Sequence, residues 1–314
     1  MQRAIELGRQ ARYWSAPNPP VGCVLVRDDQ ELGAGFTQPA GQAHAEVMAL
    51  NAAGDATGAT VYVTLEPCSH QGQTGPCVSA LIDAGAARVV VAVEDPNPKV
   101  AGRGIAALRA AGIDVELGEG ADQVEADLAG FLLRMRRGYG RITLKIAMSL
   151  DGCIAMASGE SQWITGDLAR AHVHSRRAEA DAILVGGGTW RSDQPRLDVR
   201  LPGLEQRGPQ RAVLTRGVPP DGVKVINTPG QIDTLDAFYL YIEAGANIAA
   251  SFLGADLVDR LEIYRAPIVI GNGYEAVGDI GLDALADAHG RWALAERRQL
   301  GSDSFEAYSR LRQK

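Results

Sequence analysis

Short valine-rich runs alternate with helical segments along the first half of the chain, and this alternation limits the folds that it can adopt. Residues 21–26 and 89–93 are typical of buried strands, since these runs are short, apolar and rich in β-branched side chains. Strands that alternate with helices build a largely parallel sheet covered by helices, so we expect α/β layers. The expected strands are residues 21–26, 30–35, 60–65, 89–93 and 113–117, and the expected helices are residues 5–13, 44–53, 78–84, 105–111 and 124–136.

The second half has a similar alternation and ends in an expected hairpin. The chain has 314 residues, which suggests two domains, and we predict domains at residues 1–140 and 141–314. Three glycines at 186–188 follow a strand, where they form either a plain turn or a close backbone approach to a phosphate. The expected strands are residues 142–148, 182–185, 211–214, 223–226 and 238–242, a pair at 261–264 and 268–270, and a hairpin over 292–308; the expected helices are residues 168–178 and 247–253.

The composition excludes several classes of protein. The chain has 31 Lys and Arg residues against 38 Asp and Glu residues, and a net charge of −7 argues against a nucleic-acid partner. No apolar run approaches the roughly 20 residues of a membrane helix, so we expect no membrane partner. The N-terminus has no apolar signal core and the four cysteines are too few for a disulfide scaffold. We therefore expect a cytoplasmic protein whose thiols are free to bind metal.

Three residues of the first half have the chemistry of zinc ligands. His44 is followed by Glu46, and Cys68 and Cys77 each follow a proline. An imidazole with two thiolates suits zinc, and three protein ligands leave a fourth position for water. Zinc lowers the pKa of such water to about 7, which makes hydroxide available at neutral pH. Glu46 begins a helix, where its carboxylate can face that water and carry a proton to a leaving amine.

This order of residues is the signature of zinc deaminases that act on nucleobases, in which an amino group leaves the ring as ammonia. Deaminases of nucleic acids carry two residues between the cysteines, whereas eight separate Cys68 from Cys77. The spacing opposes a deaminase of RNA or free nucleobases, which stays an alternative. A binding module with a purely structural zinc is another.

Longer motifs resemble one known family over nearly the whole chain. They are residues 18–24 (NPPVGCV), 44–47 (HAEV), 64–70 (TLEPCSH) and 95–98 (DPNP) in the first half, and Lys145, residues 149–152 (SLDG) and residues 158–165 (SGESQWIT) in the second. These motifs resemble the bifunctional deaminase–reductases of riboflavin biosynthesis. The resemblance implies an N-terminal cytidine-deaminase-like three-layer α/β/α domain, followed by a dihydrofolate-reductase-like α/β domain.

The resemblance also implies two consecutive reactions on one small phosphorylated pyrimidine. The first is hydrolytic deamination of 2,5-diamino-6-(5-phosphoribosylamino)pyrimidin-4(3H)-one at a single zinc ion per chain. The second is reduction of the ribosyl group to a ribityl chain by NADPH. The family further implies a homo-oligomer, either a dimer or a tetramer.

Residue roles follow from the same resemblance. It implies that Asn18 contacts the pyrimidine in the deaminase domain, beside the zinc ligands and Glu46. It implies two arginine phosphate ligands in the reductase domain, Arg177 and Arg200, because a guanidinium fork fits phosphate oxygens. The implied cofactor contacts are Trp163, Thr189, Asp193, Gly245, Ala246, Asn247 and Ser251, and the implied substrate contacts are Ser161, Arg177, Leu197, Arg200 and Glu243.

The chain departs from the family at several positions. Thr37 stands where the family usually has His, and Gln73 where it usually has Arg or Lys. Losing these groups weakens phosphate recognition in the deaminase pocket, so a reductase with a weakened deaminase is a further alternative. We expect His172 and His174 to be solvated on a charged helix, and Cys23 and Cys153 to be packing residues.

Overall fold

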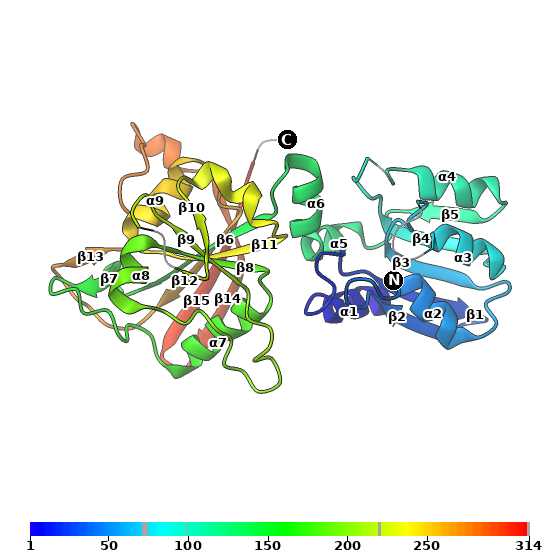
Figure 1. The fold of residues 1–314 in the computed structure, drawn as a ribbon, viewed down its shortest axis with the longest axis horizontal. Helices are drawn as coiled ribbons and strands as arrows, with labels where there is room; N and C mark the ends of the chain where they lie inside the picture. The colour runs from blue at the N-terminus through cyan, green and yellow to red at the C-terminus, as the bar shows by residue number, and fades with distance from the viewer. Residues whose placement is uncertain (71–74, 99, 219–220, 313–314) are drawn as a thin grey trace. The chain divides into compact units, whose positions relative to one another are not determined.

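The structure of the protein is a computed structural model that describes residues 1–70, 75–98, 100–218 and 221–312. It divides into two compact units, Met1–Gly138 and Tyr139–Lys314. Each unit is built on a sheet of its own (Figure 1). No helix in the described part of the chain has both the length and the apolar character needed to cross a membrane.

The first unit contains a five-stranded sheet in the order β2-β1-β3-β4-β5. Strands β3, β4 and β5 are parallel, and β1 runs antiparallel to both of its neighbours. All five strands predicted for this half are present. β1, β3 and β4 are apolar runs that turn or loop residues bound, which is a local signal. The strands are β1 (Gly22–Arg27), β2 (Gln30–Phe36), β3 (Thr60–Leu65), β4 (Arg88–Val93) and β5 (Asp114–Leu117).

Six helices accompany this sheet among the residues that the structure describes, and two of them correct the sequence prediction. The predicted helix over 124–136 is two helices, since the backbone leaves helical geometry at Leu128 and buries that side chain. The helices are α1 (Gln2–Ala11), α2 (Ala45–Ala53), α3 (Cys77–Asp83), α4 (Arg103–Ala110), α5 (Ala121–Asp127) and α6 (Ala129–Arg137).

Glycines on β2 bring α2 unusually close to the sheet. A Cβ atom on Gly33 would lie 2.3 Å from the Ala49 carbonyl oxygen, and one on Gly35 would lie 2.7 Å from the Ala45 carbonyl oxygen. Only small side chains fit between backbones at this distance, and α2 turns Ala45 and Ala49 toward β2. Glu46 is also buried, whereas residues 47, 50 and 53 are only half-buried.

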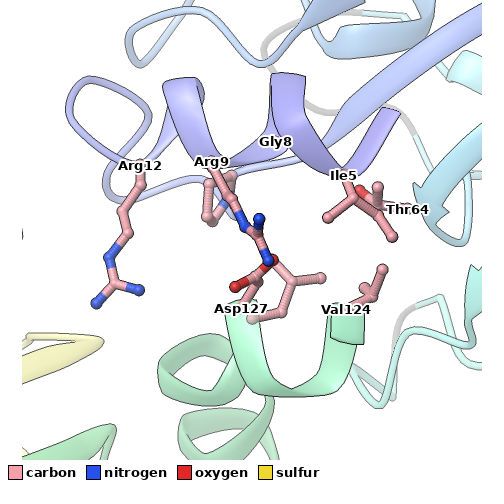
Figure 2. Close-up of a pocket in the computed structure, with 9 residues that line it drawn as sticks. Ile5, Gly8, Arg9, Arg12, Thr64, Val124 and Asp127 are labelled. Atoms are coloured by element: carbon pink, nitrogen blue, oxygen red, sulfur yellow. The ribbon is translucent and has the colours of Figure 1, made fainter. Parts of the chain in front are cut away.

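The opposite face of the same sheet is covered by α1. Gly22 pairs with Phe36 and so shares its face, and a Cβ on Gly22 would meet the Ala4 backbone of α1. Helix α5 joins α1 through an ion pair in which Arg9 Nε donates to Asp127 Oδ2 at 2.7 Å (Figure 2). The first unit therefore has three layers, with α2 on one face and α1 with α5 on the other.

The second unit contains an eight-stranded sheet in the order β10-β9-β8-β11-β6-β12-β15-β14. The six strands from β10 to β12 are parallel, β15 is antiparallel to β12, and β14 is antiparallel to β15. The strands are β6 (Arg141–Met148), β8 (Ala182–Gly186), β9 (Gln210–Leu214), β10 (Lys224–Ile226), β11 (Tyr239–Glu243), β12 (Arg260–Arg265), β14 (Trp292–Leu300) and β15 (Asp303–Arg310).

Helices pack on both faces of this sheet. One core cluster joins the sheet to α9 (Ala246–Gly254) through Phe252, and a second joins it to α7 (Asp167–Ala178) through Val173. A short helix, α8 (Gly187–Asp193), follows β8, and 3-10 turns occur at Pro229–Leu235 and Leu285–Ala288. A separate two-stranded sheet pairs β7 (Cys153–Met156) with β13 (Gly273–Glu275).

One expectation about this unit was wrong: residues 268–270 form no strand, because β12 pairs with β6 and with β15 instead. The three glycines at 186–188 lie where β8 ends and α8 begins. A Cβ on Gly186 would lie 2.7 Å from Ile248, and one on Gly187 would lie 2.7 Å from the Thr215 hydroxyl, so these two glycines allow close packing.

We expect the Gly35→Ala substitution to destabilise the first unit and so to increase its local unfolding. The added methyl would collide with backbone atoms of α2, and overpacking of this kind costs about 1–3 kcal/mol. Amide hydrogen exchange in β1 and β2 measures the opening free energy of this unit alone. Gly208→Ala is the control, since its Cβ would meet nothing within 4 Å; equal exchange in both variants would contradict the close packing.

Candidate functional site

Three of the predicted site residues meet at one end of the first sheet. His44 lies immediately before α2, Cys68 lies in the loop that follows β3, and Cys77 is the first residue of α3. Their potential ligand atoms all lie within 4.8 Å of one another. No other group of His, Cys, Asp and Glu ligands is as close within the described part of the chain.

The separations fit a tetrahedral zinc ion. His44 Nδ1 lies 3.7 Å from Cys68 Sγ and 3.4 Å from Cys77 Sγ. With ordinary Zn–N and Zn–S bond lengths, a nitrogen and a sulfur ligand of a tetrahedral zinc lie about 3.6 Å apart. The hydrogen bond with Cys77 lowers the pKa of the Cys68 thiol, which favours the thiolate that a metal requires.

Glu46 lies beside this group in the first turn of α2. Its side chain is buried, and burial raises its pKa to about 7, with the charge of Cys68 acting in the same direction. A carboxylate whose pKa is near neutrality can both accept and release a proton. A zinc cation in the adjacent site would favour the ionised form.

Asn18, the expected pyrimidine contact, lies in a different loop from the three metal ligands. Asn18 lies half-buried in the loop before β1, and its backbone N–H donates to the Ser15 carbonyl at 2.7 Å. Thr37 is buried, and its hydroxyl accepts from the Val21 N–H at 3.1 Å, so it faces the β1 backbone. His70 is outside the ligand group. Gln73 lies outside the described residues.

A small cavity beside α1 is separate from the metal ligands. It measures about 30 Å³, which is room for about one or two water molecules. Ile5, Thr64 and Val124 contribute to its wall, and Figure 2 shows Arg9 and Asp127 meeting beside them. None of the predicted site residues lines it.

The second unit contains a much larger cavity of about 350 Å³. It lies at the carboxyl end of parallel strands, where α/β proteins usually bind ligands. Eight predicted residues line it: Ser161, Trp163, Arg177, Thr189, Asp193, Arg200, Glu243 and Gly245. Lys145, Arg170 and His174 also line it and were not predicted. The sequence offered one signal for Lys145 as a site residue, since a lysine in the middle of an otherwise apolar strand is unusual.

Three charged groups form a compact set in the wall of this cavity. Lys145 of β6 pairs in register with Glu243 of β11. Glu243 accepts from Arg177 Nε at 2.6 Å and from Arg177 Nη2 at 3.0 Å. Burial lowers the pKa of Lys145, while the nearby Lys145 and Arg177 charges outweigh burial and lower the pKa of Glu243. The half-buried Glu243 carboxylate is thereby held ionised beside two cations.

The segment around Arg200 is tied to α7. Arg177 Nη1 donates to the Asp198 carbonyl at 3.0 Å, and the Arg200 N–H donates to His174 Nδ1 at 3.3 Å. The Arg200 guanidinium pairs with the Asp198 carboxylate at 2.9 Å. His174 is thus half-buried in the cavity wall, and the expectation that it is solvated was wrong.

His172 is also not solvated. Its Nδ1 lies 2.8 Å from the Tyr264 hydroxyl, and its ring packs edge-on against Phe305. Both aromatic residues belong to the buried sheet face under α7. Sequence reasoning missed this because a histidine on a charged helix gives no local sign of an aromatic partner on the sheet.

Four predicted residues of the second unit do not line the cavity. Leu197 is 2% exposed and packs in the core cluster under α7. The others lie on α9, where the Ser251 hydroxyl donates to the Ile248 carbonyl at 2.8 Å. These four residues are Leu197, Ala246, Asn247 and Ser251. Cys23 and Cys153 are both buried, in agreement with their expected packing roles.

Comparisons with known proteins agree with this division of the chain. Residues 1–93 match the family described as the cytidine and deoxycytidylate deaminase zinc-binding region. Residues 141–232 and 232–305 match the RibD C-terminal domain. The predicted fold class, a deaminase-like domain followed by a reductase domain, is therefore confirmed.

Individual relatives are similar over almost their full length. The riboflavin biosynthesis protein RibD of Escherichia coli is 41% identical, over 96% of both chains. That of Mycobacterium tuberculosis is 42% identical, over 96% of this chain and 94% of its own. The solved structure of Acinetobacter baumannii RibD, form 1, matches with a TM-score of 0.92 and 39% identity, over 99% of this chain and 98% of its own.

A solved structure from Thermotoga maritima carries a more explicit title. It is called a diaminohydroxyphosphoribosylaminopyrimidine deaminase/5-amino-6-(5-phosphoribosylamino)uracil reductase. It matches with a TM-score of 0.87 and 29% identity, over 99% of this chain and 97% of its own.

The cysteines allow a matched test of the metal centre. We expect Cys68→Ser and Cys77→Ser each to lose most of the bound zinc, because a hydroxyl is a far poorer zinc ligand than a thiolate. Cys23→Ala, which changes a buried thiol outside the ligand group, should keep it. Elemental analysis of the purified variants gives the zinc content per chain. Full zinc in either serine variant would exclude that cysteine as a ligand.

Proposed function

The chain belongs to the RibD family of riboflavin biosynthesis, and we propose on that basis that it catalyses two consecutive steps. The first domain, residues 1–140, deaminates a pyrimidine with zinc. The second, residues 141–314, reduces the product with NADPH. The observation that carries the proposal is the set of His44, Cys68 and Cys77 at zinc-ligand separations, with the buried Glu46 beside it.

The proposed substrate is the diaminopyrimidinone ribosyl phosphate. Full-length similarity to a protein titled as a deaminase and reductase of such compounds supports this choice. Deamination replaces the ring amino group with oxygen from water and releases ammonia. Reduction then adds a hydride to the ribosyl C1 carbon and opens the sugar to a ribityl chain.

Glu46 performs the proton transfers in the proposed deamination. His44, Cys68 and Cys77 would hold a zinc ion, which would lower the pKa of a water at the site to about 7. Glu46 accepts the proton of the attacking water and returns it to the amine, so that ammonia can leave. Its burial serves this role, because the carboxylate then exchanges protons with the reactants rather than with bulk solvent.

In the second domain, the chain's own residues bind and orient the substrate. NADPH supplies the hydride when it is bound. We propose that Trp163, Thr189 and Asp193 contact it from the cavity wall, with Gly245, Ala246, Asn247 and Ser251 at and after the start of α9. Ser161, Leu197 and Glu243 are the proposed substrate residues beside the two arginines.

Arg177 and Arg200 are proposed to bind the substrate phosphate. A guanidinium has five N–H groups, and Glu243 and Asp198 accept three of those of Arg177 among the described residues. Arg177 is therefore held in place rather than free, with N–H groups left for a phosphate. The Arg200 guanidinium is more exposed. Among the described residues it pairs with the carboxylate of Asp198, which lies two residues earlier in the chain.

The alternatives gain less support. A deaminase of RNA or free nucleobases does not explain the second domain, which matches the RibD C-terminal domain. One observation still favours a reductase with a weakened deaminase: the Thr37 hydroxyl bonds to the Val21 backbone, and Thr37 supplies no cation. We further propose that the protein is a cytoplasmic homo-oligomer, either a dimer or a tetramer, on the basis of its family.

Supplying the diaminopyrimidinone ribosyl phosphate tests both activities. Without NADPH, we expect release of ammonia and a product 1 Da heavier by mass spectrometry, since an amino group is replaced by a hydroxyl that tautomerises to a carbonyl. Adding NADPH should add two hydrogens to that product. Reduction of only a pre-deaminated substrate would favour the weakened-deaminase alternative, and ammonia release from transfer RNA would favour a nucleic-acid deaminase.

The Glu46→Gln variant separates the two steps. We expect it to lose at least about a hundredfold of the deaminase rate, because general acid–base catalysis contributes about 10²–10⁴-fold. Zinc content should stay at the wild-type level, since Glu46 is outside the ligand group. Reduction of the pre-deaminated substrate should continue at the wild-type rate as an internal control. A variant with full deaminase activity would rule out the proton-transfer role.

A further inference from the structure

Glu66 is a buried acid that the proposed mechanism does not use. It follows the last residue of β3 and precedes Pro67 and the proposed zinc ligand Cys68. Its side chain is 4% exposed. A carboxylate in such a place is costly unless several hydrogen bonds compensate for the lost water.

Four backbone N–H groups provide that compensation. Glu66 Oε1 accepts from Gly104 at 2.8 Å and from Ile105 at 3.2 Å. Glu66 Oε2 accepts from Gly102 at 2.9 Å and from Asp95 at 3.2 Å. No side-chain donor is among these partners, so the carboxylate binds the main chain of one connection, from the end of β4 to the start of α4.

Glu66 thereby caps α4 across a long stretch of sequence. The residue at the cap position of α4 is Gly102, which has no side chain to accept the first N–H groups of the helix. The carboxylate of Glu66, from a residue 36 positions earlier, takes that place. A negative charge at a helix N-terminus is also favoured by the helix dipole.

The same contact holds the segment that carries Cys68. The Glu66 N–H donates to the Val93 carbonyl at 2.9 Å. The Pro67 carbonyl approaches α4 so closely that a Cβ on Gly104 would lie 2.2 Å from its oxygen. Cys68 then meets α3, where its carbonyl accepts from Val78 at 3.2 Å and its sulfur accepts from Cys77 at 3.4 Å.

We propose that Glu66 is the positioning residue of the metal centre: its carboxylate joins the start of α4 to the Cys68 segment and so fixes Cys68 relative to His44 and Cys77. The arrangement requires a carboxylate. The amide group of a glutamine has one acceptor oxygen, and its NH₂ group would face N–H donors that now meet Glu66. The proposal rests on the zinc centre of the proposed function, but not on the identity of the substrate.

The Glu66→Gln variant tests this role. Partners outside the metal's ligands typically change metal affinity by about 10–100-fold, so we expect about a tenfold loss of zinc affinity in competition with a chelator. In the cobalt-substituted protein, the visible absorption of the thiolate-bound metal should change, because it reports ligand geometry. The rate of reduction should be unchanged. Wild-type zinc affinity and cobalt spectrum, with only a lower melting temperature, would overturn the proposal.

Asp55→Asn is the matched control for a lost carboxylate. Asp55 lies in the same unit, is exposed, and its Oδ1 accepts from the Thr57 N–H at 3.0 Å. It has no contact with the Cys68 segment among the described residues. We expect it to keep wild-type zinc affinity; a loss equal to that of Glu66→Gln would show a general effect of losing a carboxylate and would overturn the proposal.

A second measurement needs no variant and so does not depend on the folding of Glu66→Gln. If the Glu66 contacts and the zinc ligands are coupled, zinc must stabilise those contacts by the same factor. Amide exchange at Gly102, Gly104 and Ile105 should therefore slow when zinc binds, by more than exchange at Thr57. Equal slowing at all four amides would overturn the proposal. Zinc binding is measured without substrate, so this outcome is distinct from a failure to release ammonia.

Discussion

The first unit depends on bringing an imidazole and two thiols from three separate segments close enough to bind a single metal ion. Glycines on β2 let α2 pack very close to the sheet. His44 and Glu46 lie at the N-terminal end of this helix. The loop after β3 brings Cys68 to Cys77 at the start of α3. Each element is ordinary by itself, and the site exists because their ends coincide.

The second unit meets a different constraint, since its sheet buries charged side chains on the face under α7. Glu243 lies between Lys145 and Arg177, and Glu262 farther along the sheet pairs with Arg176 and Arg260. Each buried carboxylate has a cation within hydrogen-bond range, which offsets the cost of removing it from water. Lys145, Arg177 and Glu243 line the cavity, so part of its wall is charged.

The sequence predicted elements whose signals are local. Three strands of the first unit, β1, β3 and β4, are bounded apolar runs, and the terminal hairpin alternates about a glycine turn. Predictions failed where distant contacts decide: the helix break at Leu128, the absence of a strand at 268–270, and the aromatic partners of His172.

The sequence by itself predicted the grouping of His44, Cys68 and Cys77 and the order of the two domains, because these predictions depend on residue type and spacing. Only the tertiary structure decided which charges compensate one another and what supports the ligands. Glu66 shows the difference most clearly. Its partners lie 29 to 39 residues away and are backbone groups, which carry no sequence signature. Backbone amides are the same in every residue, so only the folded chain could show which of them a buried carboxylate would meet.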